Sequence, residues 1–208
     1  MQSSTYKFLE FFLVFIVVPV SFVLNYPIWM KLLIGITGFL YIIFVLLRVE
    51  KKQFKIAKAD NWKAFWRQTI LKLIAIIILT TLYVWAFDKS NLFSVILNKP
   101  LMWIAILFIY SLFSVYPQEL IYRTFFFQRY ETLFKSKELL IFINAIVFCL
   151  AHLFFKNTLV LALTFIGGLL FGMTFYKSKS TLFVTIEHAI YGCWLFTVGM
   201  GNMLGFPS

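Results

Sequence analysis

The stretch LLIFINAIVFCLAHLFF, residues 139–155, contains no lysine, arginine, aspartate or glutamate. A helix needs about 20 apolar residues to cross the hydrocarbon layer of a bilayer. Long apolar runs recur at residues 8–25, 28–47, 69–87, 96–116, 158–176 and 181–200. The sequence therefore predicts an all-α fold, a polytopic membrane helix bundle of about seven or eight transmembrane helices.

Composition excludes a sizeable soluble domain. Of the 208 residues, 62% are hydrophobic and only 13% are charged. A water-soluble core cannot absorb that much apolar surface. We therefore treat the chain as one integral membrane unit with two parts, the N-terminal spans in residues 1–95 and a C-terminal part in residues 96–208.

The net charge of +11 would suggest nucleic acid in a soluble protein, but here the charges flank membrane spans. Positive residues concentrate in cytoplasmic loops, so the basic linker 48–68 and the N-terminus are predicted to be cytoplasmic. The partner of this surface is then the lipid bilayer, not nucleic acid. The linker's basic residues are Arg48, Lys51, Lys52, Lys55, Lys58, Lys63 and Arg67. Its aromatic residues predict an interfacial helix along the anionic headgroups: Phe54, Trp62, Phe65 and Trp66.

Ionisable residues inside apolar spans are the strongest functional signal. A charge in a bilayer costs on the order of 3 kcal/mol or more and normally faces the bundle interior. Glu10 starts the first span and is expected to reach the solvated interface. The other candidates all lie in the C-terminal half: Glu119, Arg123, His152, Glu187 and His188.

The sequence YPQELIYR, residues 116–123, opens an amphipathic helical stretch at 117–134. Pro117 suits a first helical turn, where its missing N–H would be unsatisfied anyway. Glu119 and Arg123 are four residues apart and can face each other as an ion pair. Gln118 points about a quarter-turn away, toward a different partner. The pair either neutralises itself at an interface or belongs to a site.

Both histidines of the chain, His152 and His188, lie within apolar spans. Either alone is typical of a packing residue that is hydrogen-bonded between helices. Together with Glu119 and Glu187 they indicate a shared site. An imidazole can donate, accept or carry a proton near neutral pH, and a carboxylate can orient it or act as base. That is the chemistry of water activation.

Three short motifs follow one another inside the apolar spans: QELIYR at 118–123, FCLAH at 148–152 and HAIYG at 188–192. They resemble the CPBP intramembrane proteases, which comprise the CAAX prenyl endopeptidases and bacterial relatives associated with bacteriocin processing and immunity. The family pattern is Glu-Glu-x-x-x-Arg, then Phe-x-x-x-His, then His-x-x-x-Asn. The resemblance covers roughly residues 96–200 and marks residues 96–208 as the protease core.

The resemblance implies an intramembrane endopeptidase that hydrolyses a peptide bond of a membrane-associated protein or peptide. A motif-one glutamate and His152 would activate water for attack on the carbonyl, and His188 with its downstream partner would stabilise the oxyanion. Arg123 would hold the neighbouring glutamate. The implied catalytic residues are Glu119, His152 and His188, and the implied supporting residues are Gln118, Arg123, Glu187 and Gly192.

Two positions depart from the family pattern. The first glutamate, the expected base, is Gln118 here, and the final asparagine is Gly192, which has no side-chain donor. Glu119 could take over as base if the helix rotates slightly, or Glu187 could contribute a carboxylate beside His188.

The segment 117–134 leaves the topology open. If it lies at the cytoplasmic interface, the chain has seven spans and Lys135, Lys137, Lys177 and Lys179 stay inside, but Glu119 lies near the inner face and His152 near the outer one. If it crosses, the two site residues reach similar depth and the lysines move outside. We expect the eight-span arrangement, which is closer to the family fold, with a broken or tilted helix near Pro117 to reconcile the two requirements.

Several glycines lie within the apolar spans of the C-terminal half. Gly167, Gly168 and Gly172 form a small-residue face that predicts a close approach of helices. Gly192, one turn beyond His188, could open space beside the site.

Other interpretations stay open. A chain that has kept the scaffold but lost hydrolysis would be a catalytically silent membrane protein, acting in bacteriocin immunity or as a scaffold, and a transporter with a proton-coupled Glu/His site is a third class. No cofactor is expected. A metal on Glu119, His152 and His188 is chemically possible, but the spacing does not specify one. Chain size and the absence of organellar signals, together with the resemblance, favour a bacterial plasma membrane.

Overall fold

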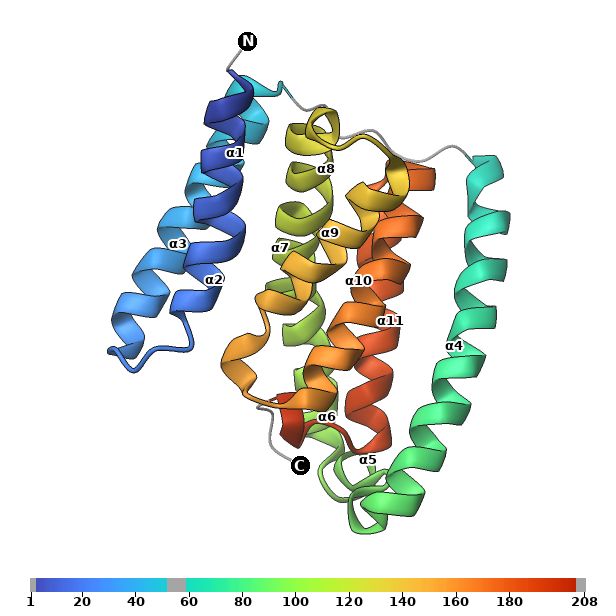
Figure 1. Ribbon diagram of the computed structural model, residues 1–208. Coiled ribbons are helices and arrows are strands. Elements are labelled where there is room, and N and C mark those ends of the chain that lie inside the picture. The colour runs from blue at the N-terminus through green and yellow to red at the C-terminus, as the bar shows by residue number, and fades with distance from the viewer. Residues whose placement is uncertain (1–2, 52–58, 205–208) are drawn as a thin grey trace. The chain divides into compact units, whose positions relative to one another are not determined.

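The computed structural model describes residues 3–51 and 59–204. This part of the chain is almost entirely helical and contains no strand (Figure 1), which confirms the predicted all-α fold. The α-helices are α1 Ser4–Phe12, α2 Val18–Ser21, α3 Ile28–Phe44, α4 Ala59–Phe87, α5 Ser94–Asn98, α6 Pro100–Ile109, α7 Tyr116–Glu119, α8 Phe126–Tyr130, α9 Lys137–Leu150, α10 Thr158–Ser178 and α11 Thr181–Val198.

Seven helical segments within the described residues are long and apolar enough to cross a membrane. Their large apolar side chains are widely exposed, for example Phe87 at 78% and Leu101 at 82%, as suits surfaces that face lipid. The chain is therefore an integral multi-pass membrane protein. The segments are Ser4–Ser21, Ile28–Val49, Trp62–Phe87, Pro100–Leu133, Lys137–Phe155, Thr158–Ser178 and Thr181–Val198.

The segment 117–134 is not a separate span. Residues Pro100–Leu133 form one continuous helical segment of 34 residues, so the expected eighth span and the expected break near Pro117 are both wrong. The hydrogen bonding widens to the i→i+5 pattern of a π-helix at Tyr110–Val115 and again at Leu120–Phe125. Such local π adjustments satisfy the backbone groups that a proline leaves without a partner, and the helix therefore continues through Pro117.

The chain divides into two compact units. Unit 1 consists of residues 1–55 and 120–179, and unit 2 of residues 56–119 and 180–208. The boundary falls inside the helical segment Pro100–Leu133, directly after Glu119. The division of the sequence at residue 95 rests on motif position rather than on such contacts, and it stays a prediction.

In unit 1, α9 and α10 pack against each other along their length. At Gly168 an added Cβ would lie 2.7 Å from the Cα of Ala145 and 3.0 Å from its Cβ. The backbones of the two helices can approach this closely only because residue 168 has no side chain. The predicted role of this glycine in close packing is confirmed.

Gly168→Ala is expected to destabilise the protein by about 1–3 kcal/mol, because α9 and α10 must separate to admit the methyl group. Gly35→Ala in α3 is the matched control, since no atom lies within 4 Å of its added Cβ. That exchange should be neutral or stabilise the helix by up to about 1 kcal/mol. Thermal unfolding of both variants in detergent measures the difference, and equal melting temperatures would contradict the packing role.

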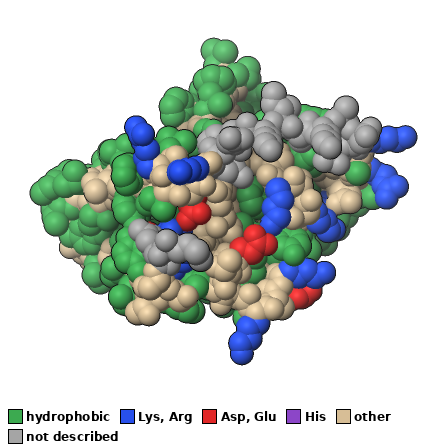
Figure 2. Space-filling view, turned by 90° about the horizontal axis from the view of Figure 1, so that it is seen from above, with side chains coloured by type: hydrophobic (Ala, Val, Ile, Leu, Met, Phe, Trp, Pro, Cys, Tyr) green, Lys and Arg blue, Asp and Glu red, His purple; other side chains and the backbone are tan. Residues whose placement is uncertain are grey.

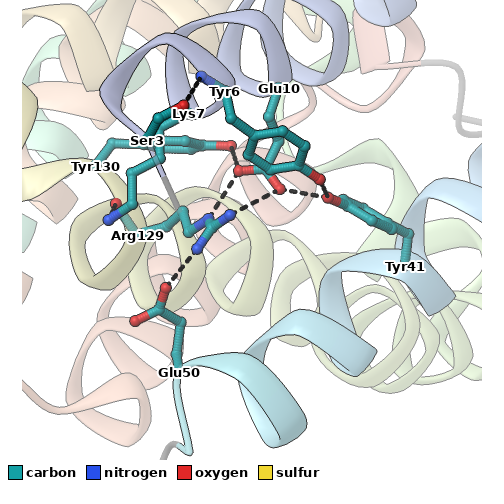
Figure 3. A network of polar contacts seen from close by, with 8 residues as sticks. All are labelled: Ser3, Tyr6, Lys7, Glu10, Tyr41, Glu50, Arg129 and Tyr130. Atoms are coloured by element: carbon teal, nitrogen blue, oxygen red, sulfur yellow. Dashed lines mark hydrogen bonds and ion pairs between the residues drawn. The ribbon is translucent and has the colours of Figure 1, made fainter. Parts of the chain in front are cut away.

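Glu10 is not a solvated helix end. Its carboxylate is buried in unit 1 and accepts hydrogen bonds from Arg129 Nε at 2.7 Å, Arg129 Nη2 at 3.3 Å, the Tyr130 hydroxyl at 3.1 Å and the Tyr41 hydroxyl (Figure 3). Arg129 Nη1 also donates to Glu50 Oε1 at 2.8 Å. The interface expectation is wrong because α1 places Glu10 against α8, where a guanidinium neutralises it.

One end of unit 1 carries most of the unit's basic residues. Lys7 Nζ donates to the Arg129 carbonyl at 3.0 Å, and Lys179 Nζ lies 3.2 Å from Glu131 Oε1, so the start of α1, the end of the segment Pro100–Leu133 and the end of α10 meet there. Figure 2 looks onto this end and shows lysine and arginine side chains on it. With seven spans, the loops at 48–51, 134–136 and 177–180 all emerge on this side.

The predicted interfacial helix in the linker is wrong for the part that the structure describes. α4 begins at Ala59, so Trp62, Phe65 and Trp66 lie in the first turns of the helix that continues through the third span. Phe65 stacks on Phe183 of α11 with ring centroids 4.5 Å apart. Phe54, Lys52, Lys55 and Lys58 lie outside the described residues.

Candidate functional site

Helix α11 of unit 2 presents two adjacent polar faces. The Ser180 hydroxyl caps its N-terminus by accepting from the Phe183 N–H at 3.3 Å. Residues four apart share a helix face, so His188 and Gly192 lie on one face, and Glu187 and Tyr191 on the next. The two neighbouring residues Glu187 and His188 therefore reach different partners.

His188 and Glu119 meet in the interior of unit 2. His188 Nδ1 lies 2.7 Å from Glu119 Oε1, and the exposed fractions are 7% for His188 and 0% for Glu119. With the carboxylate ionised, Nδ1–H donates to Oε1, and this bond fixes the imidazole with Nε2 as its basic atom. The structure thus brings together two of the three residues predicted to be catalytic.

The other ring nitrogen of His188 faces a tyrosine that the sequence analysis did not single out. The Tyr110 hydroxyl lies 3.2 Å from Nε2, and the two rings meet edge to face with centroids 6.1 Å apart. Tyr110 opens the π-helical turn Tyr110–Val115. Carboxylate, imidazole and phenol therefore form a chain of three polar groups within the bilayer-spanning part of unit 2.

Gln118 does not share the partners of Glu119. Its Nε2 donates to the Ser114 hydroxyl at 2.9 Å, one turn back on the same helical segment. The amide at the family's first glutamate position thus faces along its own helix, while Glu119 faces α11. Glu119 must face His188 of α11 if it is to replace the missing base, and it does so.

Glu187 is held on the other face of α11. Its carboxylate is fully buried, pairs with Lys72 Nζ of α4 at 2.6 Å and accepts from the Tyr191 hydroxyl at 3.0 Å. Tyr191 is also placed 3.1 Å from the Thr69 carbonyl. These contacts join α11 to α4, so they indicate a structural role for Glu187.

Lys72→Met is expected to cost about 3 kcal/mol of folding stability, because it leaves the Glu187 carboxylate buried without its cation. Adding Glu187→Gln should restore part of that loss by removing the charge. Chemical unfolding of the single and double variants measures it. A double variant no more stable than Lys72→Met would contradict the pairing.

His152 and Arg123 belong to unit 1. His152 does not lie inside a helix but just beyond the end of α9 at Leu150, where its Nδ1 lies 2.8 Å from the Phe148 carbonyl. The Phe148 ring contacts both residues, with His152 edge to face at 4.8 Å and the Arg123 guanidinium 4.2 Å above its centroid. Phe148 therefore positions the two polar residues of its unit.

Sequence reasoning missed Tyr110 and Lys72. Tyr110 stands in an apolar run with no motif spacing to either histidine, and Lys72 is a single charge among residues 69–87. Only the lysine gave a signal, since a lone cation inside a span normally has a buried anionic partner. Among residues 3–51 and 59–204, no group of three or more His, Cys, Asp or Glu side chains is placed to hold a metal ion.

Comparison with known proteins agrees with the motifs. The family described as type II CAAX prenyl endopeptidase Rce1-like matches residues 100–194, which contain all three motif segments. The resemblance to the CPBP intramembrane proteases is confirmed for this part of the chain. No curated protein and no solved structure gives a significant match.

Proposed function

We propose that this protein, whose residues 100–194 match the CAAX prenyl endopeptidase family, is an intramembrane endopeptidase. Its substrate would be a membrane-associated peptide or protein. The observation that carries the proposal is the hydrogen bond between Glu119 Oε1 and His188 Nδ1, buried inside an apolar bundle. Keeping a carboxylate in such surroundings is costly, and paired intramembrane ionisable groups generally serve a function.

In the proposed reaction the Glu119–His188 pair activates a water molecule. The water oxygen forms a bond to the scissile carbonyl carbon while one water proton passes to the pair, which becomes a carboxylate beside an imidazolium. Collapse of the tetrahedral intermediate breaks the C–N bond, and the proton moves to the leaving amine. Gln118 takes no part, because its amide cannot hold the proton.

We assign His152 to the same reaction on its motif alone. It ends the Phe-x-x-x-His segment, and the Phe148 carbonyl at 2.8 Å from Nδ1 fixes its tautomer with Nε2 as the basic atom. Arg123 and Phe148 act as positioning residues for this histidine. The assignment is tested by mutation and rests on no distance to Glu119.

The proposed orientation follows from the charges. Among the described residues of unit 1, seven basic residues flank the span ends on one side, against Lys31 and Lys156 on the other. The positive-inside rule places the richer end in the cytoplasm, and with it the N-terminus, in what we propose is a bacterial plasma membrane. These residues are Lys7, Arg48, Lys51, Lys135, Lys137, Lys177 and Lys179.

The test is hydrolysis of a library of membrane-anchored peptides by the purified protein in lipid vesicles. Wild type should cleave at least one member, and His188→Ala and His152→Ala should not, while both variants keep the wild-type melting profile. Tyr83→Phe, a change at a lipid-exposed position of α4, serves as the control and should cleave normally.

A second function has one specific observation in its favour. The base and the asparagine of the family pattern are replaced by Gln118 and Gly192. A chain that had lost hydrolysis could still bind a membrane peptide, as an immunity protein or a scaffold would. Absence of cleavage by the wild type across a broad library, combined with saturable binding of a library member, would favour this function.

A further inference from the structure

The phenol of Tyr110 fills the space that a side chain at position 192 would need. A Cβ added to Gly192 would fall onto the phenol of Tyr110, with Oη, Cε1 and Cζ as its nearest atoms. Residue 192 must therefore be glycine as long as the tyrosine lies there. The side chain that Gly192 lacks is replaced in space by a phenol from another helix.

The phenol is held rigidly at this position. The Tyr110 ring is edge to face with Phe196 at 4.8 Å and belongs to a buried apolar cluster with Ile106 and Val115. Its hydroxyl is 3.2 Å from His188 Nε2, and His188 lies one turn before Gly192 on α11. A donor fixed by packing before the reaction begins is what stabilisation of a developing charge requires.

We propose that Tyr110 supplies the hydrogen-bond donor that the family pattern takes from an asparagine at position 192. This role rests on the proposed endopeptidase function. In the resting state the Tyr110 O–H donates to His188 Nε2. When the Glu119–His188 pair takes up a proton, the Tyr110 proton passes to Nε2 and the tyrosine oxygen takes the water proton in its place. The new Nε2–H then donates to the tyrosine oxygen, and the new tyrosine hydrogen turns toward the carbonyl oxygen that has become negative.

This exchange makes the Tyr110 interaction stronger in the transition state than in the ground state. The hydroxyl gains an anionic acceptor only after the proton has moved, so it should affect kcat far more than KM. A tyrosine that only packs would show the opposite pattern, with an effect on stability and none on kcat. The two roles therefore separate in one kinetic measurement.

The experiment uses the full-length protein in lipid vesicles and one cleavable peptide found with the wild type. Tyr110→Phe keeps the ring and its packing, and it is expected to lower kcat about 100-fold with little change in KM. Tyr191→Phe removes another buried tyrosine hydroxyl, one that donates to Glu187, and should leave kcat within about 3-fold of the wild type.

An exchange of the two side chains provides the rescue. Tyr110→Ala and Gly192→Asn should each be nearly inactive, the first without a donor and the second because its side chain collides with the phenol. The double variant Tyr110→Ala/Gly192→Asn regains both the room and the donor, and should recover at least 10-fold over either single variant. Equal kcat for Tyr110→Phe and Tyr191→Phe would overturn the role of Tyr110, whereas a wild type that cleaves nothing would overturn the proposed function itself.

Discussion

Glu119→Gln should lower kcat of peptide cleavage by at least about 1000-fold, within the range that general acid–base residues contribute. The amide is nearly isosteric with the carboxylate, so its oxygen can still accept from His188 Nδ1–H. The neutral amide cannot stabilise the imidazolium electrostatically. The loss should therefore appear in turnover while the melting profile stays close to that of the wild type. Initial rates in vesicles at saturating peptide measure it.

Gln118, next to Glu119, allows a control variant with the same amino-acid composition. Gln118→Glu/Glu119→Gln exchanges the two side chains and keeps the net charge, but it puts the carboxylate where Nε2 of Gln118 now contacts Ser114. We expect this double variant to be as inactive as Glu119→Gln. Glu138→Gln removes a glutamate that is 70% exposed and should behave as the wild type. An active exchanged variant would show that position 118 supplies the base.

Arg129→Met should destabilise the protein by about 3–5 kcal/mol, the largest loss of stability we expect from a single exchange. Methionine has a similar length, so packing is roughly kept, but the Glu10 carboxylate remains buried with no cation beside it. Loss of the bond to Glu50 should cost less stability, because the Glu50 side chain is 20% exposed and reaches solvent. Unfolding in denaturant, followed by tryptophan fluorescence in detergent, gives the free energies.

A double-mutant cycle separates the ion pair from the packing. Glu10→Gln alone should cost less than Arg129→Met, since the two tyrosine hydroxyls keep a neutral acceptor. The double variant Glu10→Gln/Arg129→Met should be more stable than Arg129→Met alone, because no unpaired buried charge is left between α1 and α8. Additive losses would mean that the two residues act independently, contrary to the geometry of Figure 3.

Much of the fold was predictable because apolar length alone specifies membrane helices. Five of the predicted spans agree with the helices to within four residues at each end, and the predicted span 69–87 lies inside the longer helix Trp62–Phe87. The segment 117–134 was expected to be an eighth span because that arrangement is closer to the family fold, but it continues the helical segment that begins at Pro100. Its polar residues face the protein: Glu119 and Arg123 are both fully buried, so the amphipathic pattern reflects an interior face.

Of the candidate site, the sequence could predict only the residues that belong to the motifs. Glu119 and His188 were singled out by charge in an apolar run, and they lie 2.7 Å apart. Tyr110 could not be found, because a tyrosine among apolar residues is common and its meaning depends on a contact across helices. The burial of Glu10 was missed for the same reason, since its partner Arg129 is far along the chain.

The π-helical turn Tyr110–Val115 bears on how the first motif should be aligned. Such a turn holds one residue more than an α-helical turn and is equivalent to a single-residue insertion, which rotates everything that follows by about 100°. The direction that residue 118 would take in a regular α-helix is therefore taken by residue 119. Under the proposed endopeptidase function, the carboxylate of Glu119 would then serve in place of the glutamate that position 118 lacks.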